Sequence, residues 1–113
     1  MPQTVNELLG NYISAVQNIY GEHLKKIILY GSYARGDFTN DSDVDIMLLV
    51  DLPEDKLDTF SDKLSELGFE HNVNHGIWFM PVVKNEGHFR YWCEAYPFYN
   101  NVAKEGISLY ETA

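Results

Sequence analysis

The sequence predicts an α+β fold with two layers, in which helices cover a small β-sheet. Two apolar runs predict buried strands, one over residues 25–30 and one over residues 46–50. Segments with helical periodicity precede the first run and follow the second. With 113 residues, 45% of them hydrophobic, the chain has room for one core, which predicts a single domain over residues 1–113.

Two helices are expected on either side of these strands. A capping-box sequence at residues 4–7 precedes apolar residues at helical spacing that continue to Gly21, which predicts a first helix of about four turns packed on the sheet. After the second apolar run, Pro53 opens a segment with one apolar side and one charged side. Gly68 is expected to end this second helix.

The C-terminal half predicts one strand and two more helices. The second helix crosses over to an apolar strand at residues 77–83, where Pro81 favours a sheet edge or a bulge. Helices are then predicted over residues 85–96 and 97–106, the latter between an opening proline and a closing glycine.

The segment between the first two strands carries the residues that are candidates for binding a phosphate or a metal ion. Gly31 and Ser32 form a turn after the first strand, and amide groups that open a short helix there would attract a phosphate. Asp43 and Asp45 are two residues apart at the start of the second strand, so their side chains project from one face. Two such carboxylates repel each other unless a cation lies between them, and oxygen ligands favour Mg²⁺ or Mn²⁺.

This pattern resembles the nucleotidyltransferase superfamily that includes DNA polymerase β. The resemblance rests on Gly31, Ser32, Gly36, Asp43 and Asp45, and the Gly-Ser-Tyr-Ala-Arg-Gly form resembles the minimal nucleotidyltransferases of bacteria and archaea. It implies a small mixed β-sheet with helices packed mainly on one face. It also implies that the two aspartates hold two Mg²⁺ ions, with Mn²⁺ as a substitute, and that the Gly-Ser turn holds the β and γ phosphates of a nucleoside triphosphate.

The acidic composition limits the partners of the chain. A net charge of −9 with only eight Lys and Arg residues argues against sequence-independent binding of nucleic acid, because such binding depends on cations that neutralise phosphates. The charge of a bound triphosphate must be met by a metal, by amide groups and by Arg35. Arg35 has an alternative, which is to pair with Asp37 or Asp41.

The chain departs from the family at one catalytic position. Active members carry a third carboxylate on the next strand, in a segment resembling Tyr-Asp-Val-Val-Ile-Ser-Pro. If Met80 and Pro81 correspond to that Ser-Pro, the acidic position falls on Gly76, which has no side chain. Glu70, His75, water or a group from a partner protein are the candidate replacements.

Three other features are read as structural. His71 and His75 are expected in a loop or strand entry and not in a zinc site. Cys93 is expected to be a small buried hydrophobe among aromatic residues. The sequence has no leader-like N-terminus and no apolar run of the roughly 20 residues that a membrane span needs, which predicts a cytoplasmic protein without membrane attachment.

The resemblance also implies a function. Similar minimal nucleotidyltransferases are encoded beside a small helical HEPN protein and act as antitoxins, moving AMP from ATP to a hydroxyl, expected to be that of a tyrosine, on that toxin. The alternative is a catalytically degenerate binding module that neutralises its partner by complex formation alone. Another nucleoside triphosphate in place of ATP, and a homo-oligomer, are both compatible with the sequence, whereas transfer to a small molecule usually requires an additional domain.

Overall fold

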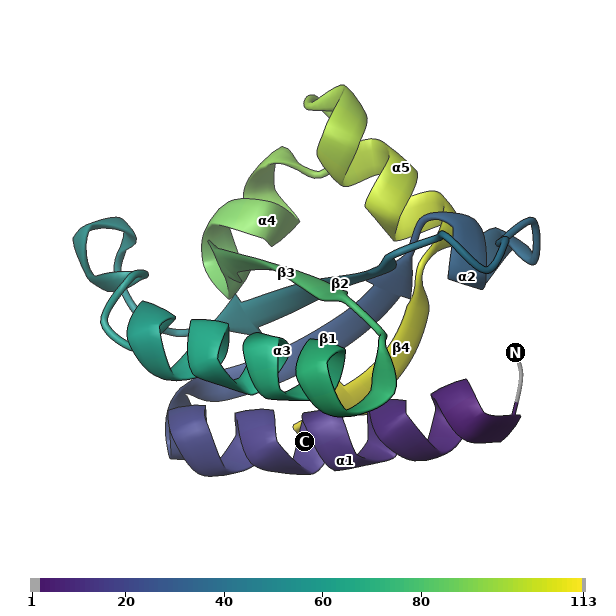
Figure 1. Cartoon of the computed structure of the whole chain (residues 1–113). Helices are drawn as coiled ribbons and strands as arrows, with labels where there is room; N and C mark the ends of the chain where they lie inside the picture. The colour runs from purple at the N-terminus through teal and green to yellow at the C-terminus, as the bar shows by residue number, and fades with distance from the viewer. Residues whose placement is uncertain (1–2, 113) are drawn as a thin grey trace.

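The computed structural model describes residues 3–112 as a four-stranded sheet with helices on both faces (Figure 1). The two longest helices lie on one face and two shorter helices lie on the other. The helical elements are α1 (Gln3–Tyr20), η1 (Gly21–His23), α2 (Ser32–Arg35), η2 (Glu54–Lys56), α3 (Ser61–His75), α4 (Glu86–Trp92) and α5 (Pro97–Glu105). None of the helices in this described part of the chain has the length and apolar character to cross a membrane.

The sheet is mixed, as predicted. Its strands are β1 (Leu24–Tyr30), β2 (Val44–Val50), β3 (Phe79–Asn85) and β4 (Ile107–Glu111), arranged in the order β3-β2-β1-β4. β1 pairs antiparallel with β2 and with β4, whereas β2 and β3 are parallel and are connected through α3. Pro81 therefore lies on an edge strand, where a missing N–H is tolerated.

Alternating residues of the two central strands form two separate cores. Ile27 and Leu29 of β1 pack toward α1 and α3, with the alternate residues of β2 from Val44 to Val50. Ile28 of β1 and Met47 and Leu49 of β2 face the opposite way, toward α4 and α5. The α+β class and the main helical layer are confirmed, but the prediction of two layers is incomplete because α4 and α5 form a third.

The second predicted helix differs most from expectation. Only a short 3-10 turn follows Pro53, and α3 begins at Ser61 and continues through Gly68 to His75. Gly68 is buried within α3, where a Cβ atom would lie 3.9 Å from the Phe79 carbonyl oxygen, and it does not end the helix. The end comes at Gly76, whose left-handed conformation (φ 68°) and N–H bond to the Asn72 carbonyl form a helix cap.

The starts of α4 and α5 follow local signals, but α4 ends at Trp92, before the predicted end at residue 96. The side chain of Asn85 accepts the N–H of His88 and caps α4, and Pro97 is the first residue of α5. At the N-terminus, α1 begins at Gln3, so Thr4 lies inside the helix and is not its cap. The strand β4, which directly follows α5, was not predicted.

Candidate active site

The turn between β1 and α2 approaches the second aspartate closely. Gly31 has φ 76° and ψ −155°, a conformation that residues with a side chain rarely adopt. A Cβ atom built on Gly31 would overlap the Oδ2 atom of Asp45, so the position excludes a side chain for a second, independent reason. The predicted Gly-Ser turn and the short helix after it are therefore present, and the turn is packed against a carboxylate.

The two aspartates lie at the beginning of β2. Asp43 directly precedes the strand, and Asp45 is its second residue, on the α4–α5 side of the sheet with Met47 and Leu49. Burial raises the pKa of Asp45, and the charge of Asp43 raises it further, while the charge of Arg35 lowers it. The two carboxylates are thus close enough to repel each other, and a divalent cation between them would relieve that repulsion.

A magnesium ion fits this donor set when it is brought by a nucleotide. Mg²⁺ is commonly bound by one or two carboxylates together with substrate phosphates and water, so two aspartates beside a phosphate-binding turn are sufficient. Among residues 3–112, no group of three or more His, Cys, Asp or Glu side chains is arranged to hold a metal ion by itself.

Arg35 ends α2 and is held by two carboxylates. Its Nε atom donates to Oδ2 of Asp37 at 3.2 Å, and its Nη1 atom donates to Oε1 and Oε2 of Glu105 at 3.3 and 3.4 Å. The bonds to Asp37 and then Glu105 raise the pKa of the guanidinium further above its usual range. The structure thus supports pairing with Asp37 and not with Asp41, and it adds a partner that was not anticipated.

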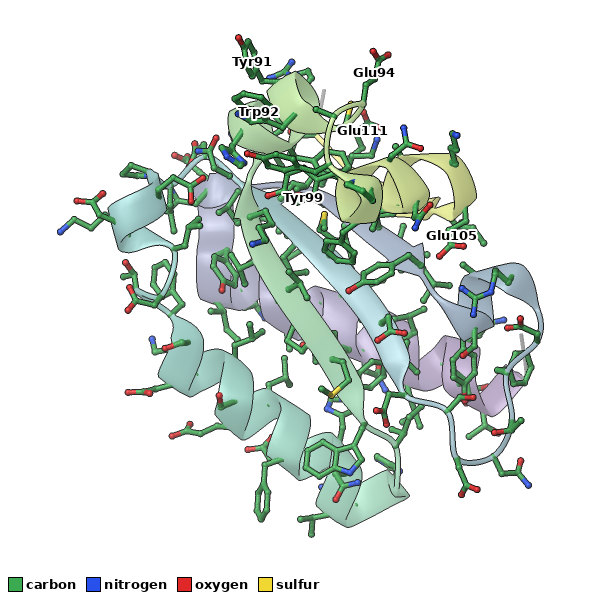
Figure 2. All side chains as sticks on the ribbon, turned by 90° about the horizontal axis from the view of Figure 1, so that it is seen from above. Tyr91, Trp92, Glu94, Tyr99, Glu105 and Glu111 are labelled. Carbon is green, nitrogen blue, oxygen red and sulfur yellow. The ribbon has the colours of Figure 1, made fainter. Side chains whose placement is uncertain are left out.

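Glu105 is the site residue that sequence reasoning missed. It is the last residue of α5, yet its Oε1 atom also accepts the N–H of Gly31 at 3.1 Å (Figure 2). Its charge is a further factor that raises the pKa of Asp45. No local pattern in the sequence indicates that residue 105 reaches Gly31, which is 74 residues away along the chain.

Aromatic side chains line the same face of the site. Tyr30 pairs with Asp45 across the β1–β2 ladder, and its ring packs edge-on against Phe98 of α5 with ring centres 5.6 Å apart. Burial, with a smaller contribution from the charge of Asp45, raises the pKa of Tyr30 to about 12. Tyr30 is therefore neutral at physiological pH and adds no charge beside the aspartates.

The neighbouring strand β3 presents a methionine, and no carboxylate, beside Asp45. In the parallel β2–β3 ladder, Met80 is the partner of Asp45, and its side chain is 45% exposed. Gly76, the position inferred from the Ser-Pro alignment, is not on the strand at all, because it caps α3. The charges that shift the pKa of Asp45 come from Asp43, Arg35 and Glu105, and neither of the proposed substitutes, Glu70 and His75, contributes.

His71 and Cys93 pack against other parts of the fold, whereas His75 lines a small cavity with Tyr33 and Ser42, close to the start of β2. His71 and His75 are both on α3, which corrects the expectation of a loop. The Nδ1 atom of His71 is 3.0 Å from the Leu67 carbonyl oxygen, and its ring packs edge-on against Tyr12 and Phe79. Cys93 is partly buried against the α4–α5 core, with Sγ 3.5 Å from the Arg90 carbonyl oxygen.

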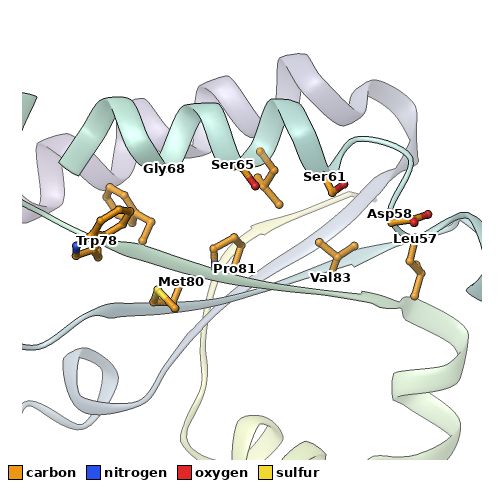
Figure 3. A pocket seen from close by; sticks show the side chains of 11 residues that line it. Leu57, Asp58, Ser61, Ser65, Gly68, Trp78, Met80, Pro81 and Val83 are labelled. Carbon is orange, nitrogen blue, oxygen red and sulfur yellow. The ribbon is translucent and has the colours of Figure 1, made fainter. Parts of the chain in front are cut away.

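A separate groove of about 530 Å³ runs between α3 and the edge strand β3 (Figure 3). Trp78, Met80, Pro81 and Val83 line it from the strand, and Ser61, Ser65 and Gly68 line it from the helix. Its lining includes neither aspartate of the β2 pair nor the Gly-Ser turn. The groove is mostly apolar and has no group suited to phosphate chemistry, so it is not the candidate active site.

A mixed sheet with paired carboxylates on one strand and a glycine turn on its antiparallel neighbour defines a class of nucleotide-transferring proteins. A model of the nucleotidyltransferase domain matches residues 9–93. The chain is 34% identical over 102 residues to a "putative protein adenylyltransferase" of Methanocaldococcus jannaschii, covering 90% of this chain and 94% of the relative. A second protein of the same name and organism is 30% identical over 78 residues, covering 68% of this chain and 76% of the relative. The chain therefore belongs to the nucleotidyltransferase family.

Two solved structures share the fold. One is a crystal structure of a toxin-antitoxin with AMP-PNP, with a TM-score of 0.54 and 22% identity, which covers 90% of this chain and 73% of that chain. The other is a "putative nucleotidyltransferase" from Sulfolobus solfataricus, with a TM-score of 0.54 and 18% identity, which covers 98% of this chain and 90% of that chain. Both support the nucleotidyltransferase fold.

Proposed function

We propose that this chain moves AMP from ATP to a hydroxyl group on a partner protein. The observation that carries the proposal is the packing of Asp45 against Gly31, which puts a carboxylate directly beside the turn whose amides would receive a triphosphate. Membership of the nucleotidyltransferase family supports nucleotide transfer. The names of the Methanocaldococcus relatives, which describe protein adenylyltransferases, support a protein as the acceptor.

Asp43 and Asp45 would hold Mg²⁺, with Mn²⁺ as a substitute, and the family resemblance implies two ions. Both carboxylates are oxygen donors of the kind these ions prefer, and their mutual repulsion is what a cation relieves. When bound, the metal supplies a lower pKa for the acceptor hydroxyl and stabilises the charge of the departing pyrophosphate.

The chain's own residues bind and orient the nucleotide. Gly31 leaves the backbone open to close approach, Ser32 offers its amide and hydroxyl, and the guanidinium of Arg35 meets negative charge. The acceptor oxygen forms a bond to the α-phosphorus as the bond from that phosphorus to the bridging oxygen breaks. Pyrophosphate leaves with the bridging oxygen, the proton of the acceptor hydroxyl passes to water, and the product is AMP joined to the acceptor oxygen.

The proposed acceptor is a tyrosine of a small helical HEPN-type toxin, which makes this chain an antitoxin. The fold shared with a toxin-antitoxin structure that contains AMP-PNP supports the pairing and the choice of ATP. Large apolar side chains are exposed on and around α4 and α5, and Figure 2 shows Tyr91 and Trp92 projecting from α4. Exposed aromatic residues of this kind are enriched in protein interfaces.

A second candidate is a binding module that neutralises its partner by contact alone. The observation that favours it is Met80 beside Asp45, since a thioether can neither bind Mg²⁺ well nor accept the proton of a hydroxyl. On this alternative the two aspartates remain in the fold without supporting transfer.

Transfer of a labelled nucleotide separates the two candidates. The purified chain is mixed with the HEPN-type protein, Mg²⁺ and α-³²P-labelled ATP, and label on the partner is measured after electrophoresis. The proposal predicts labelling that requires Mg²⁺ and disappears with Asp43→Asn or Asp45→Asn. Asp62→Asn, which removes the same charge from the exposed face of α3, serves as the matched control and should label normally.

A tight complex without label would favour the binding module. Label that persists in both aspartate variants would place the chemistry elsewhere in the chain. Mass spectrometry of the labelled partner tests the tyrosine assignment separately, because serine or threonine modification leaves the transfer intact and changes only the acceptor.

A further inference from the structure

Glu105 contacts two of the three residues that the proposed function assigns to the triphosphate, Gly31 and Arg35. Its carboxylate accepts the N–H of Gly31 at 3.1 Å and contacts Nη1 of Arg35 through both oxygens, at 3.3 and 3.4 Å. Figure 2 shows Glu105 at the end of α5 on the side of α2. The side chain is only 27% exposed, so these contacts are partly shielded from water.

A carboxylate and a phosphate compete for the same donors. The Gly31 N–H carries a single hydrogen and, once it is donated to Glu105, it is no longer available to a phosphate oxygen. Arg35 already directs Nε to Asp37 and Nη1 to Glu105. A phosphate oxygen that takes the Gly31 N–H or the Nη1 group of Arg35 must therefore displace Glu105 first.

The backbone that carries Glu105 is held firmly over the turn. The next residue, Gly106, donates its N–H to the Val102 carbonyl at 2.8 Å. A Cβ atom built on Gly106 would overlap that carbonyl oxygen and Cγ2 of Ile28 on β1. Because the end of α5 is packed this closely on β1, displacement requires rotation of the Glu105 side chain and not movement of the helix.

We propose that Glu105 acts as a tethered anion that occupies the phosphate cradle and that a nucleoside triphosphate must displace it to bind. The inference rests on the proposed function, because it takes Gly31 and Arg35 as phosphate ligands. Glu105 would thereby set the nucleotide affinity without contacting the reacting atoms. Its negative charge, next to those of Asp43 and Asp45, opposes a triphosphate until the side chain turns away.

Calorimetric titration with Mg²⁺ and AMP-PNP tests the competition. Glu105→Gln removes the charge and retains an acceptor, and Glu105→Ala removes both. We expect nucleotide binding to tighten roughly two- to tenfold in Glu105→Gln, as the loss of a partly exposed, charge-assisted contact allows, and by at least as much in Glu105→Ala. Glu111→Gln is the matched control, because this exposed residue of β4 pairs with Lys26 and should leave affinity unchanged.

The outcomes distinguish this inference from the proposed function. Nucleotide affinity that is unchanged or weaker in both Glu105 variants overturns the inference and indicates that Glu105 only holds Arg35 in place. In that case, Mg²⁺-dependent nucleotide binding by the unmodified chain still supports the proposed function. Absence of binding in every variant overturns both. Tighter binding in the Glu105 variants and not in Glu111→Gln supports the inference.

A measurement on the unmodified chain guards against variants that fold poorly. The carboxyl carbon of Glu105 is followed by ¹³C NMR during titration with Mg²⁺ and AMP-PNP. Displacement predicts that its chemical shift moves toward that of a solvated carboxylate, while the Glu111 carboxyl carbon stays in place. A Glu105 signal that does not move when the chain is saturated with nucleotide overturns the inference.

Discussion

The parallel strands β2 and β3 begin at the same end of the sheet and contribute opposite chemistry there. β2 brings Asp43 and Asp45, whereas β3 brings Met80 beside Asp45, preceded by the exposed Trp78. The carboxylates that contact Gly31 and Arg35 come from the β1–β2 connection, as Asp37, and from the end of α5, as Glu105. The two aspartates and the glycine turn provide the groups needed to bind a metal–nucleotide complex. The adjacent strand β3, however, supplies no group that could accept the proton of an attacking hydroxyl.

The largest effect is expected from removing a carboxylate of β2. Asp45→Asn keeps the shape of the side chain and removes an anionic metal ligand, so AMP transfer should fall on the order of 10²- to 10⁴-fold. Transfer rates to the HEPN-type partner under saturating ATP measure the loss. A variant that retains transfer within about twofold of the unmodified chain would show that β2 does not hold the metal.

A carboxylate can be introduced on β3, so that this strand also presents an acidic residue at the site. Met80→Asp would add a third carboxylate beside Asp45, and we expect transfer to rise about tenfold or more if the missing group limits the rate. Met80→Asn, which is similar in size and uncharged, is the control. The added repulsion should also lower the melting temperature in EDTA and make it recover with Mg²⁺; equal rates in the two variants would argue that β3 is not the limiting feature.

Two glycines of the β1–β2 connection differ in what surrounds them. Gly31→Ala meets both a positive φ of 76° and the Asp45 carboxylate, so it should destabilise the fold by about 1–3 kcal/mol. Gly36→Ala meets a positive φ of 86° but no atom within 4 Å, so it should cost about 1 kcal/mol. Urea denaturation of both variants measures the difference, and equal costs would contradict the close approach of Asp45 to Gly31.

The smallest effect concerns stability and pH. The pKa of Asp45 is raised in the folded chain, so the folded state binds its proton more tightly than the unfolded state does, and stability is lost as pH rises between the two pKa values. Asp45→Asn removes this loss, so at pH 7 without metal it should raise the melting temperature by about 1–4 °C after allowance for solvent exposure. Calorimetry in EDTA measures the melting temperatures of Asp45→Asn and of the unmodified chain. The difference should vanish at pH values below the pKa of Asp45 in both the folded and the unfolded state. A lower melting temperature for Asp45→Asn at pH 7 would show that Asp45 stabilises the metal-free fold.

The sequence predicts those parts of the molecule that depend on short-range patterns. The strand β1, the turn at Gly31, the short helix after it and the strand β2 follow from apolar runs and from residues close together in the chain. Pro97 and Gly106 mark α5 for the same reason. The roles of Asp43 and Asp45 stay predictions, although the structure places both at the start of β2, with Asp43 directly before the strand and Asp45 on it.

Features that depend on distant packing were not predicted. Gly68 is a residue type that often ends helices, but here it is buried inside α3, which continues to His75. The strand β4 is defined by pairing with β1 and has only a short local signal. Glu105 reaches Gly31 across 74 residues of sequence, so no spacing rule could bring it to the site.

The most direct test of the central claim is paramagnetic broadening by Mn²⁺ in the presence of AMP-PNP. A metal held by the β2 carboxylates should broaden the amide NMR signals of Gly31, Asp45 and Met80 and spare those of Glu22 and Asp51 at the opposite end of the sheet. In Asp45→Asn the same addition should leave all of these signals sharp. Broadening centred at another part of the chain, or none at nucleotide saturation, would contradict a metal–nucleotide site at Asp43 and Asp45.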